Sequence, residues 1–140
     1  MIQVVKKHEN AVLPRRSHSE DIGMDLVCIS IYKKLDSGVI LYDTGLSMKP
    51  PPDFYIEIIP RSSISKSGWI LANSIGVIDP NYTGNFLVAL APLSPSSATL
   101  QLPFCLTQIV LRKAFRSEIE VVSSIEETMR GEGGFGSTNK

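Results

Sequence analysis

The sequence predicts an all-β fold, and three features of the chain support this prediction. Short segments rich in β-branched and aromatic residues recur along the chain. Nine prolines punctuate these segments, and proline fits poorly in a central strand or in a helix interior. No segment keeps a sustained helical period of apolar residues. Many short strands separated by turns are typical of a β-sandwich, a jelly roll or a barrel.

The segments expected to form strands share a high content of Val, Ile, Leu, Phe and Tyr. They are residues 2–5, 24–31, 39–42, 54–59, 69–72, 75–79, 85–91, 106–111 and 119–122. Two short helical turns are expected, at 62–66 and at 123–128. The pair Pro80-Asn81 favours a turn, so we expect a hairpin whose tip displays Asp79 and Tyr82.

Length, charge and cysteine content limit the function classes. The 140 residues suit one compact domain, and 14 basic against 14 acidic residues give no net charge. A broad positive electrostatic field that would attract nucleic acid or a membrane is therefore not expected. Any bound anion must instead be held by a local cluster of side chains. No apolar run approaches the ~20 residues that span a bilayer, and the N-terminus lacks the apolar core of a signal peptide. Cys28 and Cys105 are expected to be buried free thiols of an intracellular protein, cytoplasmic or nuclear and not secreted.

The last eleven residues, RGEGGFGSTNK, differ from the rest of the chain. Such a glycine-rich segment buries too little surface to order itself, so we expect a β-rich domain over 1–128 and a mobile arm over 129–140. Its bare N–H groups, hydroxyls and Arg130 suit phosphate oxygens, and Phe135 offers a face on which a base can stack. The segment is not a P-loop, because Ser137 stands where that motif needs Lys. Taken alone, it is equally compatible with a flexible tail that has no role.

Four further clusters stand out, and each also has an ordinary structural explanation. They are DIGMDL at 21–26, PRSSISKSG at 60–68, LANSIGVIDPNYTGN at 71–85 and LPFCLTQIV at 102–110. Taken alone, the first is a turn entering a strand, the second a helix cap and the third a structural hairpin. The fourth places Gln108 in an apolar strand, where it needs hydrogen-bond partners.

Taken together, the five clusters resemble the five motifs of the homotrimeric deoxyuridine triphosphate nucleotidohydrolases (dUTPases), in order and over nearly the full chain. The tail RGEGGFGSTN and the segment GVIDPNY are the most specific of them. The resemblance implies a distorted jelly-roll or β-clip-like domain with a flexible arm. It also implies a homotrimer whose active sites are shared between subunits.

The resemblance also implies a role for each matching residue. Asp79 is expected to activate the attacking water, and Tyr82 to pack against the deoxyribose where a 2′-hydroxyl would clash. The residues expected to bind the base and the sugar are Asn73, Gly76, Ile78, Tyr82 and Phe135. Those expected to bind phosphate are Arg61, Ser62, Ser63, Gln108, Arg130, Gly136, Ser137 and Thr138. Asp25 is expected to hold a magnesium ion indirectly, through water.

The implied reaction is hydrolysis of dUTP to dUMP and pyrophosphate by in-line attack of water on the α-phosphorus. This would supply dUMP and limit uracil incorporation into DNA. A triphosphate brings about four negative charges, more than Arg61 and Arg130 neutralise, so Mg²⁺ is the expected cofactor. No nucleic acid and no membrane is expected as a partner.

Three positions depart from the family pattern. Ser63 stands where Gly is usual, Cys105 stands where the fourth motif usually has Arg, and Met24 stands where an aromatic residue or Ala is common. We interpret the missing Arg as a structural or interface ion pair, whose loss affects subunit packing more than chemistry.

Two other functions are compatible with parts of the sequence. This chain resembles the dCTP deaminases in the strings at 61–63 and 78–80. The resemblance implies that deamination needs a Glu about ten residues past Asp79, where this chain has Ala89. A non-catalytic nucleotide-binding or signalling protein on the same scaffold is the second alternative.

Overall fold

The computed structural model describes residues 1–137, and over this range it is all-β, as predicted. Its regular elements are strands and one short 3-10 helix. They are β1 (Gln3–Lys6), β2 (Met24–Cys28), β3 (Ser30–Lys34), β4 (Ile40–Asp43), β5 (Leu46–Lys49), β6 (Phe54–Pro60), η1 (Ser62–Lys66), β7 (Trp69–Leu71), β8 (Gly76–Ile78), β9 (Leu87–Pro92) and β10 (Phe104–Lys113). No helix in the described part of the chain is long and apolar enough to cross a membrane.

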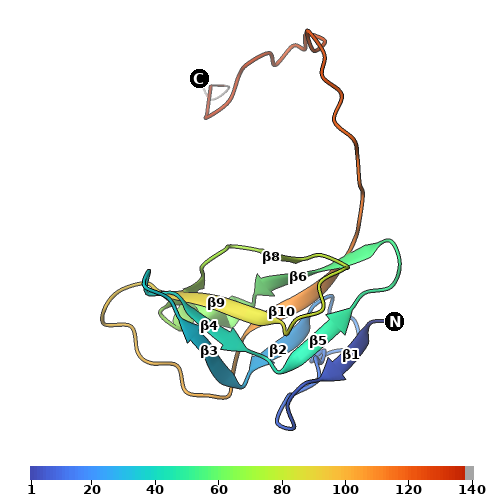
Figure 1. Ribbon diagram of the computed structural model, residues 1–140. Coiled ribbons are helices and arrows are strands. Elements are labelled where there is room, and N and C mark those ends of the chain that lie inside the picture. The colour runs from blue at the N-terminus through green and yellow to red at the C-terminus, as the bar shows by residue number, and fades with distance from the viewer. Residues whose placement is uncertain (138–140) are drawn as a thin grey trace.

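The strands form two four-stranded antiparallel sheets and one small sheet (Figure 1). One large sheet has the order β2-β10-β6-β8 and the other has the order β3-β4-β9-β7, while β1 pairs with β5. Strands that follow one another along the chain, such as β8 and β9, often belong to different sheets. This crossing between sheets is a feature of the jelly-roll-like fold that the sequence predicted.

A single hydrophobic core joins the inner faces of the two large sheets. Leu26, Ile58 and Ile109 come from one sheet, and Val88 and Leu90 come from the other. Burial alternates along β9, so a slip of one residue would turn Val88 and Leu90 toward solvent. Because each buried aliphatic side chain contributes roughly 1.5–3 kcal/mol, the alternation fixes the register of the strand.

For two of the predicted elements, the strand pairing in the structure differs from the prediction. The expected strand over 24–31 is two strands, because the chain passes from one sheet to the other at Ile29. The hairpin expected around Pro80-Asn81 was wrong: β8 pairs with β6, whereas β9 pairs with β4 and β7. The turn itself is present, since the Tyr82 N–H donates to the Asp79 carbonyl at 3.0 Å.

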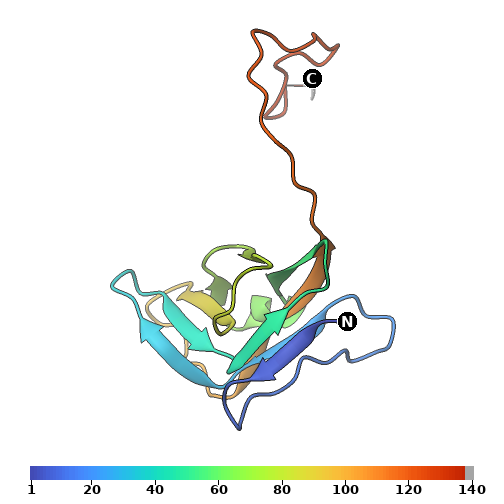
Figure 2. The ribbon, with the colours of Figure 1, turned by 45° about the vertical axis from the view of Figure 1, so that its right-hand side comes forward.

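Beyond β10 the chain leaves the sheets. The strand expected at 119–122 and the helical turn expected at 123–128 are both absent in this part of the described structure. Figures 1 and 2 show the segment rising away from the sheets, so its backbone has no neighbouring strand with which to pair. Its apolar side chains are exposed, with Ile119 and Val121 each 94% accessible. Extended chain already begins after Lys113, within the range 1–128 that we assigned to the β-rich domain.

The first prediction concerns Glu57, which lies buried on β6. Its carboxylate accepts hydrogen bonds from the Tyr55 hydroxyl at 2.8 Å and from Arg112 Nε at 3.0 Å. These bonds, that of Tyr55 first, lower the pKa of Glu57 below its ordinary value. The stabilisation is therefore present above about pH 4.5, the ordinary value, and is lost as the pH falls through the lower folded-state pKa.

We expect Glu57→Gln to reduce the free energy of unfolding by about 1 kcal/mol at neutral pH, and the difference from the native chain to shrink in acid. Urea unfolding near pH 7 and near pH 3.5 measures both values. Equal stability of the two chains at neutral pH would contradict the prediction.

Candidate functional site

Strand β10 brings together three polar residues that are far apart in the sequence. Gln108 pairs with Asp25 on β2 on one side and with Ile59 on β6 on the other. Arg61 directly follows β6, and its Nε lies 2.9 Å from Asp25 Oδ1. We call Asp25, Arg61 and Gln108 the Arg61 cluster.

Main-chain carbonyls orient the cluster. A register shift between Phe104 and Thr107 leaves Cys105 out of the pairing with β2, and its carbonyl accepts a hydrogen bond from Arg61 Nη1 at 3.0 Å. Gln108 Nε2 donates to the Pro60 carbonyl at 3.0 Å. Two of the five guanidinium N–H donors are thereby used, and the others remain for a ligand.

The cluster is suited to an anion. The side chains of Arg61 and Asp25 are about one-third exposed, at 31% and 32%. Ser62 and Ser63 are exposed beside them at the start of η1. A guanidinium held in place with free donors and two adjacent hydroxyls is the arrangement that binds phosphate.

Gly23 lies directly against this cluster, although sequence reasoning assigned it no role beyond a turn. A Cβ at Gly23 would overlap Oε1 of Gln108. The signal was the glycine immediately before a strand, but only the pairing of β2 with β10 identifies the side chain that it must accommodate.

A second group of residues forms a small pocket beyond the end of β8. The turn at Asp79 and Tyr82 closes a cavity of about 180 Å³, which we call the Asp79 pocket. Its lining residues are Val77, Ile78, Asp79, Tyr82, Asn85 and Leu87. Tyr82 is 42% exposed, so its ring is available to a ligand. Sequence reasoning missed Asn85 and Leu87 because the crossing from β8 to β9 was not recognised.

Asn73 and Gly76 lie together at the other end of β8. A Cβ on Gly76 would stand 3.4 Å from Asn73 Nδ2 and 3.2 Å from the Cβ of Ile58, so the strand passes close to both. Of the residues expected to bind the base and the sugar, Ile78 and Tyr82 line the Asp79 pocket, whereas Asn73 and Gly76 are not among its lining residues.

The Arg61 cluster and the Asp79 pocket are separate within one chain. Ile78, which precedes Asp79, pairs with Ile56. Arg61 lies five positions after Ile56, which corresponds to about 15–20 Å along a strand. The contacts of Arg61 also point toward β10 and β2, on the side of β6 away from β8. A triphosphate, measured from its α-phosphorus to its terminal oxygens, is shorter than this distance. A single triphosphate therefore cannot span both groups of the same chain.

The expected arm residues lie away from both groups (Figures 1 and 2). Arg130 Nε donates to the Gly133 carbonyl at 2.8 Å, and Phe135 is fully exposed. Gly136 has a φ of 82° and Ser137 donates its N–H to the Gly134 carbonyl, so the segment forms local turns. Thr138 lies outside the described residues.

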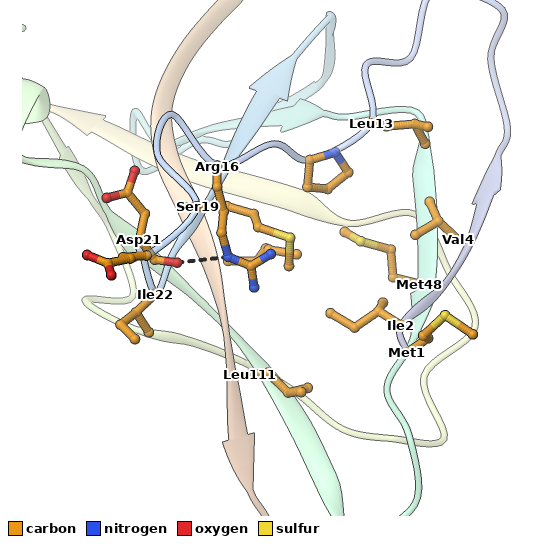
Figure 3. Close-up of a pocket in the computed structure, with 14 residues that line it drawn as sticks. Met1, Ile2, Val4, Leu13, Arg16, Ser19, Asp21, Ile22, Met48 and Leu111 are labelled. Atoms are coloured by element: carbon orange, nitrogen blue, oxygen red, sulfur yellow. Dashed lines mark hydrogen bonds between the residues drawn. The ribbon is translucent and has the colours of Figure 1, made fainter.

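A second cavity, of about 870 Å³, lies elsewhere (Figure 3). Apolar side chains including Ile2, Val4, Met48 and Leu111 line it, and at its rim Arg16 Nε donates to the Asp21 carbonyl at 2.8 Å. It contains none of the predicted site residues. Its polar lining residues, Arg16, Ser19, Glu20 and Asp21, include two carboxylates against one guanidinium, so it is a poor candidate for a triphosphate site.

The cysteines are free, as expected, and Cys105 is only partly buried. Burial raises the pKa of the Cys105 thiol, although the guanidinium of Arg61 opposes this effect. The thiol is therefore protonated near neutral pH and is not activated as a nucleophile.

The fold and these two groups define an all-β protein with a cationic cluster suited to an anion and a separate pocket that carries a carboxylate. Comparison with known proteins identifies it further. The dUTPase family model matches residues 9–139, and the chain belongs to the dUTPase family.

Relatives and solved structures agree with this assignment. The chain is 34% identical over 140 residues to deoxyuridine 5′-triphosphate nucleotidohydrolase of Wolinella succinogenes, covering 99% of this chain and 94% of the relative. It is 37% identical to the enzyme of the same name from Rickettsia massiliae, covering 96% and 94%. The dUTPase of Staphylococcus bacteriophage 80alpha, solved as a mutant with dUpNHpp, matches with a TM-score of 0.75 at 20% identity, covering 99% and 98%. That similarity shows the fold alone.

The second prediction concerns Gly23. We expect Gly23→Ala to lower the free energy of unfolding by about 1 kcal/mol, because the added methyl group must displace the Gln108 amide and break its hydrogen bond to the Pro60 carbonyl. Urea unfolding measures the effect. Gly134→Ala is a matched control, since a Cβ there meets nothing within 4 Å.

A double variant shows whether the overlap with Gln108 is the cause. Gly23→Ala combined with Gln108→Ala should be no less stable than Gln108→Ala alone, because the overlapping side chain is gone. Additive losses would show that the methyl group acts elsewhere.

Proposed function

We propose that this chain hydrolyses dUTP to dUMP and pyrophosphate, with Asp79 as the group that activates water. The observation that carries the proposal is the Asp79 pocket, where a carboxylate and a partly exposed tyrosine line one small cavity. Membership of the dUTPase family and relatives named for this activity over nearly the whole chain support it. The reaction would supply dUMP and limit uracil incorporation into DNA.

The proposed reaction divides the work between the two groups. Asp79 takes a proton from a water molecule in line with the α-phosphorus, and the leaving pyrophosphate carries the developing charge away from the pocket. Arg61, Ser62 and Ser63 bind this leaving group through their free donors. Gln108 and Asp25 hold Arg61 and its neighbours in place, as the contacts of the Arg61 cluster indicate.

The Asp25 carboxylate of the Arg61 cluster suits a magnesium ion that is held indirectly, through water. Among residues 1–137, no group of three or more His, Cys, Asp or Glu side chains could hold a metal ion. Asp25 uses Oδ1 for Arg61, so Oδ2 would be the oxygen to hold a hydrated ion indirectly, through water. When bound, Mg²⁺ supplies charge neutralisation at the phosphate oxygens. A Mg(II) ion is described in a related structure, a mutant dUTPase of phage phi11 with a TM-score of 0.72 and 18% identity.

Recognition of the nucleoside is assigned to the residues around β8. Tyr82 packs against the deoxyribose, where a 2′-hydroxyl would clash, and Ile78 lines the same pocket. Asn73 and the backbone of Gly76 read the uracil, because a backbone N–H facing O4 would meet the amino group of cytosine, donor against donor.

The site is completed by neighbouring subunits of a homotrimer. The separation of about 15–20 Å between Arg61 and Asp79 in one chain supports this, because a second copy can bring its pocket to the cluster. The exposed apolar chain at Ile119 and Val121 and the open apolar cavity beside β1 are further surfaces that an assembly would cover. The arm closes over the bound nucleotide: Phe135 stacks on uracil, and Arg130, Gly136, Ser137 and Thr138 contact the γ-phosphate.

The alternative activities have less support. Ala89 faces β4 from β9 at the position where deamination would need a carboxylate. Asp79 and Tyr82 line a formed pocket, which argues against a scaffold that only binds nucleotides.

The third prediction tests the reaction. With Mg²⁺, we expect pyrophosphate release from dUTP and much slower release from dCTP, dTTP and UTP. Asp79→Asn should reduce the dUTP rate by at least about 100-fold, because the amide cannot accept the proton from water. Ammonia release from dCTP would instead indicate a deaminase, and no reaction of any nucleotide would contradict the proposal.

The fourth prediction tests the shared site. Arg61→Gln and Asp79→Asn should each be inactive alone, whereas the two unfolded together and refolded should recover roughly a quarter of the native rate, as random pairing in a trimer requires. Each variant refolded separately and mixed afterwards is the control. An inactive co-refolded mixture with the native molecular mass would show that each site lies within one chain.

A further inference from the structure

We propose that Asp43 is a positioning residue, which acts through Asn85 on Tyr82 and thereby sets the discrimination against a ribose 2′-hydroxyl. The inference rests on the function proposed above, in which Tyr82 packs against the deoxyribose. Neither Asp43 nor Asn85 has a role in the five motifs as we matched them.

Tyr82 is folded back over its own loop. Its hydroxyl donates to the carbonyl of Asn85 at 2.8 Å, and its ring centroid lies 6.4 Å from that of the buried Phe86. A Cβ on Gly84 would overlap the Tyr82 hydroxyl, so this glycine lets the ring lie close to the backbone. The ring orientation therefore depends on where residues 84–86 are held.

Asp43 holds that stretch from outside the loop. Asn85 Nδ2 lies 3.1 Å from Oδ1 and 3.0 Å from Oδ2 of Asp43, and the Gly45 N–H also donates to Oδ1, at 2.7 Å. Asp43 ends β4 and Asn85 precedes β9, so the contact joins two segments 42 residues apart. Both side chains are partly buried, and a hydrogen bond to a carboxylate is stronger than a neutral one.

The pair is part of a larger attachment between the turn at 43–47 and the loop at 82–86. Thr44 Oγ1 donates to the Phe86 carbonyl at 2.8 Å, and the Phe86 N–H donates to the Leu46 carbonyl at 2.7 Å. Ser47 Oγ donates to the Thr83 carbonyl at 3.0 Å. Among these contacts, only that of Asp43 reaches a side chain that lines the Asp79 pocket.

The chemistry of the pair also fixes the orientation of the Asn85 amide. A carboxylate only accepts hydrogen bonds, so the amide must present Nδ2 to Asp43, and Oδ1 takes no part in this contact. The Asp43–Asn85 pair therefore determines both the placement of the Tyr82 hydroxyl and the polar group beside it.

The test compares dUTP with UTP, which differ only in the 2′-hydroxyl of the sugar and share the same base and triphosphate. We expect Asp43→Ala to lower the dUTP/UTP ratio of kcat/KM by about tenfold, mainly through a higher KM for dUTP. Asp36→Ala, in the exposed turn between β3 and β4, is the matched control and should keep the native ratio.

A side-chain exchange distinguishes the pair from a general contribution to folding. Asn85→Asp places two carboxylates together and should lower the ratio at least as much as Asp43→Ala. The double variant Asp43→Asn with Asn85→Asp can form the bond in the opposite sense, and it should restore the ratio to within about threefold of native. The added charge at position 85 affects both substrates alike, because they carry the same triphosphate.

The outcomes separate the two proposals. If the native chain discriminates between dUTP and UTP but Asp43→Ala, folded by circular dichroism, keeps the native ratio, the positioning role is overturned and the hydrolase stands. Failure of the exchanged pair to restore the ratio would also overturn it. If the native chain does not hydrolyse dUTP, the proposed function fails, and this inference fails with it.

Discussion

The double pairing of β10 is the constraint on which the described structure most depends. This strand of ten residues lies between β2 and β6 and supplies part of the core through Ile109. The same pairing sets Gln108 opposite Asp25, so the register that buries the apolar face also assembles the Arg61 cluster. Stability and the proposed binding of phosphate are therefore linked through one strand, and a register error would disrupt both.

The Asp79 pocket depends on a different kind of support. β8 has only three residues, and the loop that follows it crosses to the other sheet. Irregular segments of this kind have few main-chain partners of their own. Here the turn at 43–47 provides them, and Gly45 allows it with a φ of 66°, in a space where a Cβ would approach Ile29, His8 and Ala11. A position distant in sequence thus defines the loop that carries Tyr82.

The sequence allowed the fold class and most strands to be predicted, because β-branched segments and proline turns are local signals. Motif strings are local signals too, and they singled out Asp79, Tyr82 and Arg61, whose roles stay predictions. The roles of Gly23 and Asn85 could not be predicted in this way. Each depends on a partner across a sheet or a turn, Gln108 in one case and Asp43 in the other, and strand pairing is not local information. The segment at 119–122 illustrates the opposite error, since its β-propensity is high but no described strand pairs with it.

The departure at Cys105 can be understood from the same geometry. Arg61 Nη1 donates to the main-chain carbonyl of residue 105, and this hydrogen bond does not require a particular side chain at that position. Asp25 balances the guanidinium charge from β2, and no second arginine is needed to hold Arg61. The fourth motif therefore contributes to the cluster chiefly through Gln108 and through the shape of the strand. A backbone contact tolerates a change of side chain that a contact between side chains would not, which is why the altered motif is compatible with the proposed chemistry.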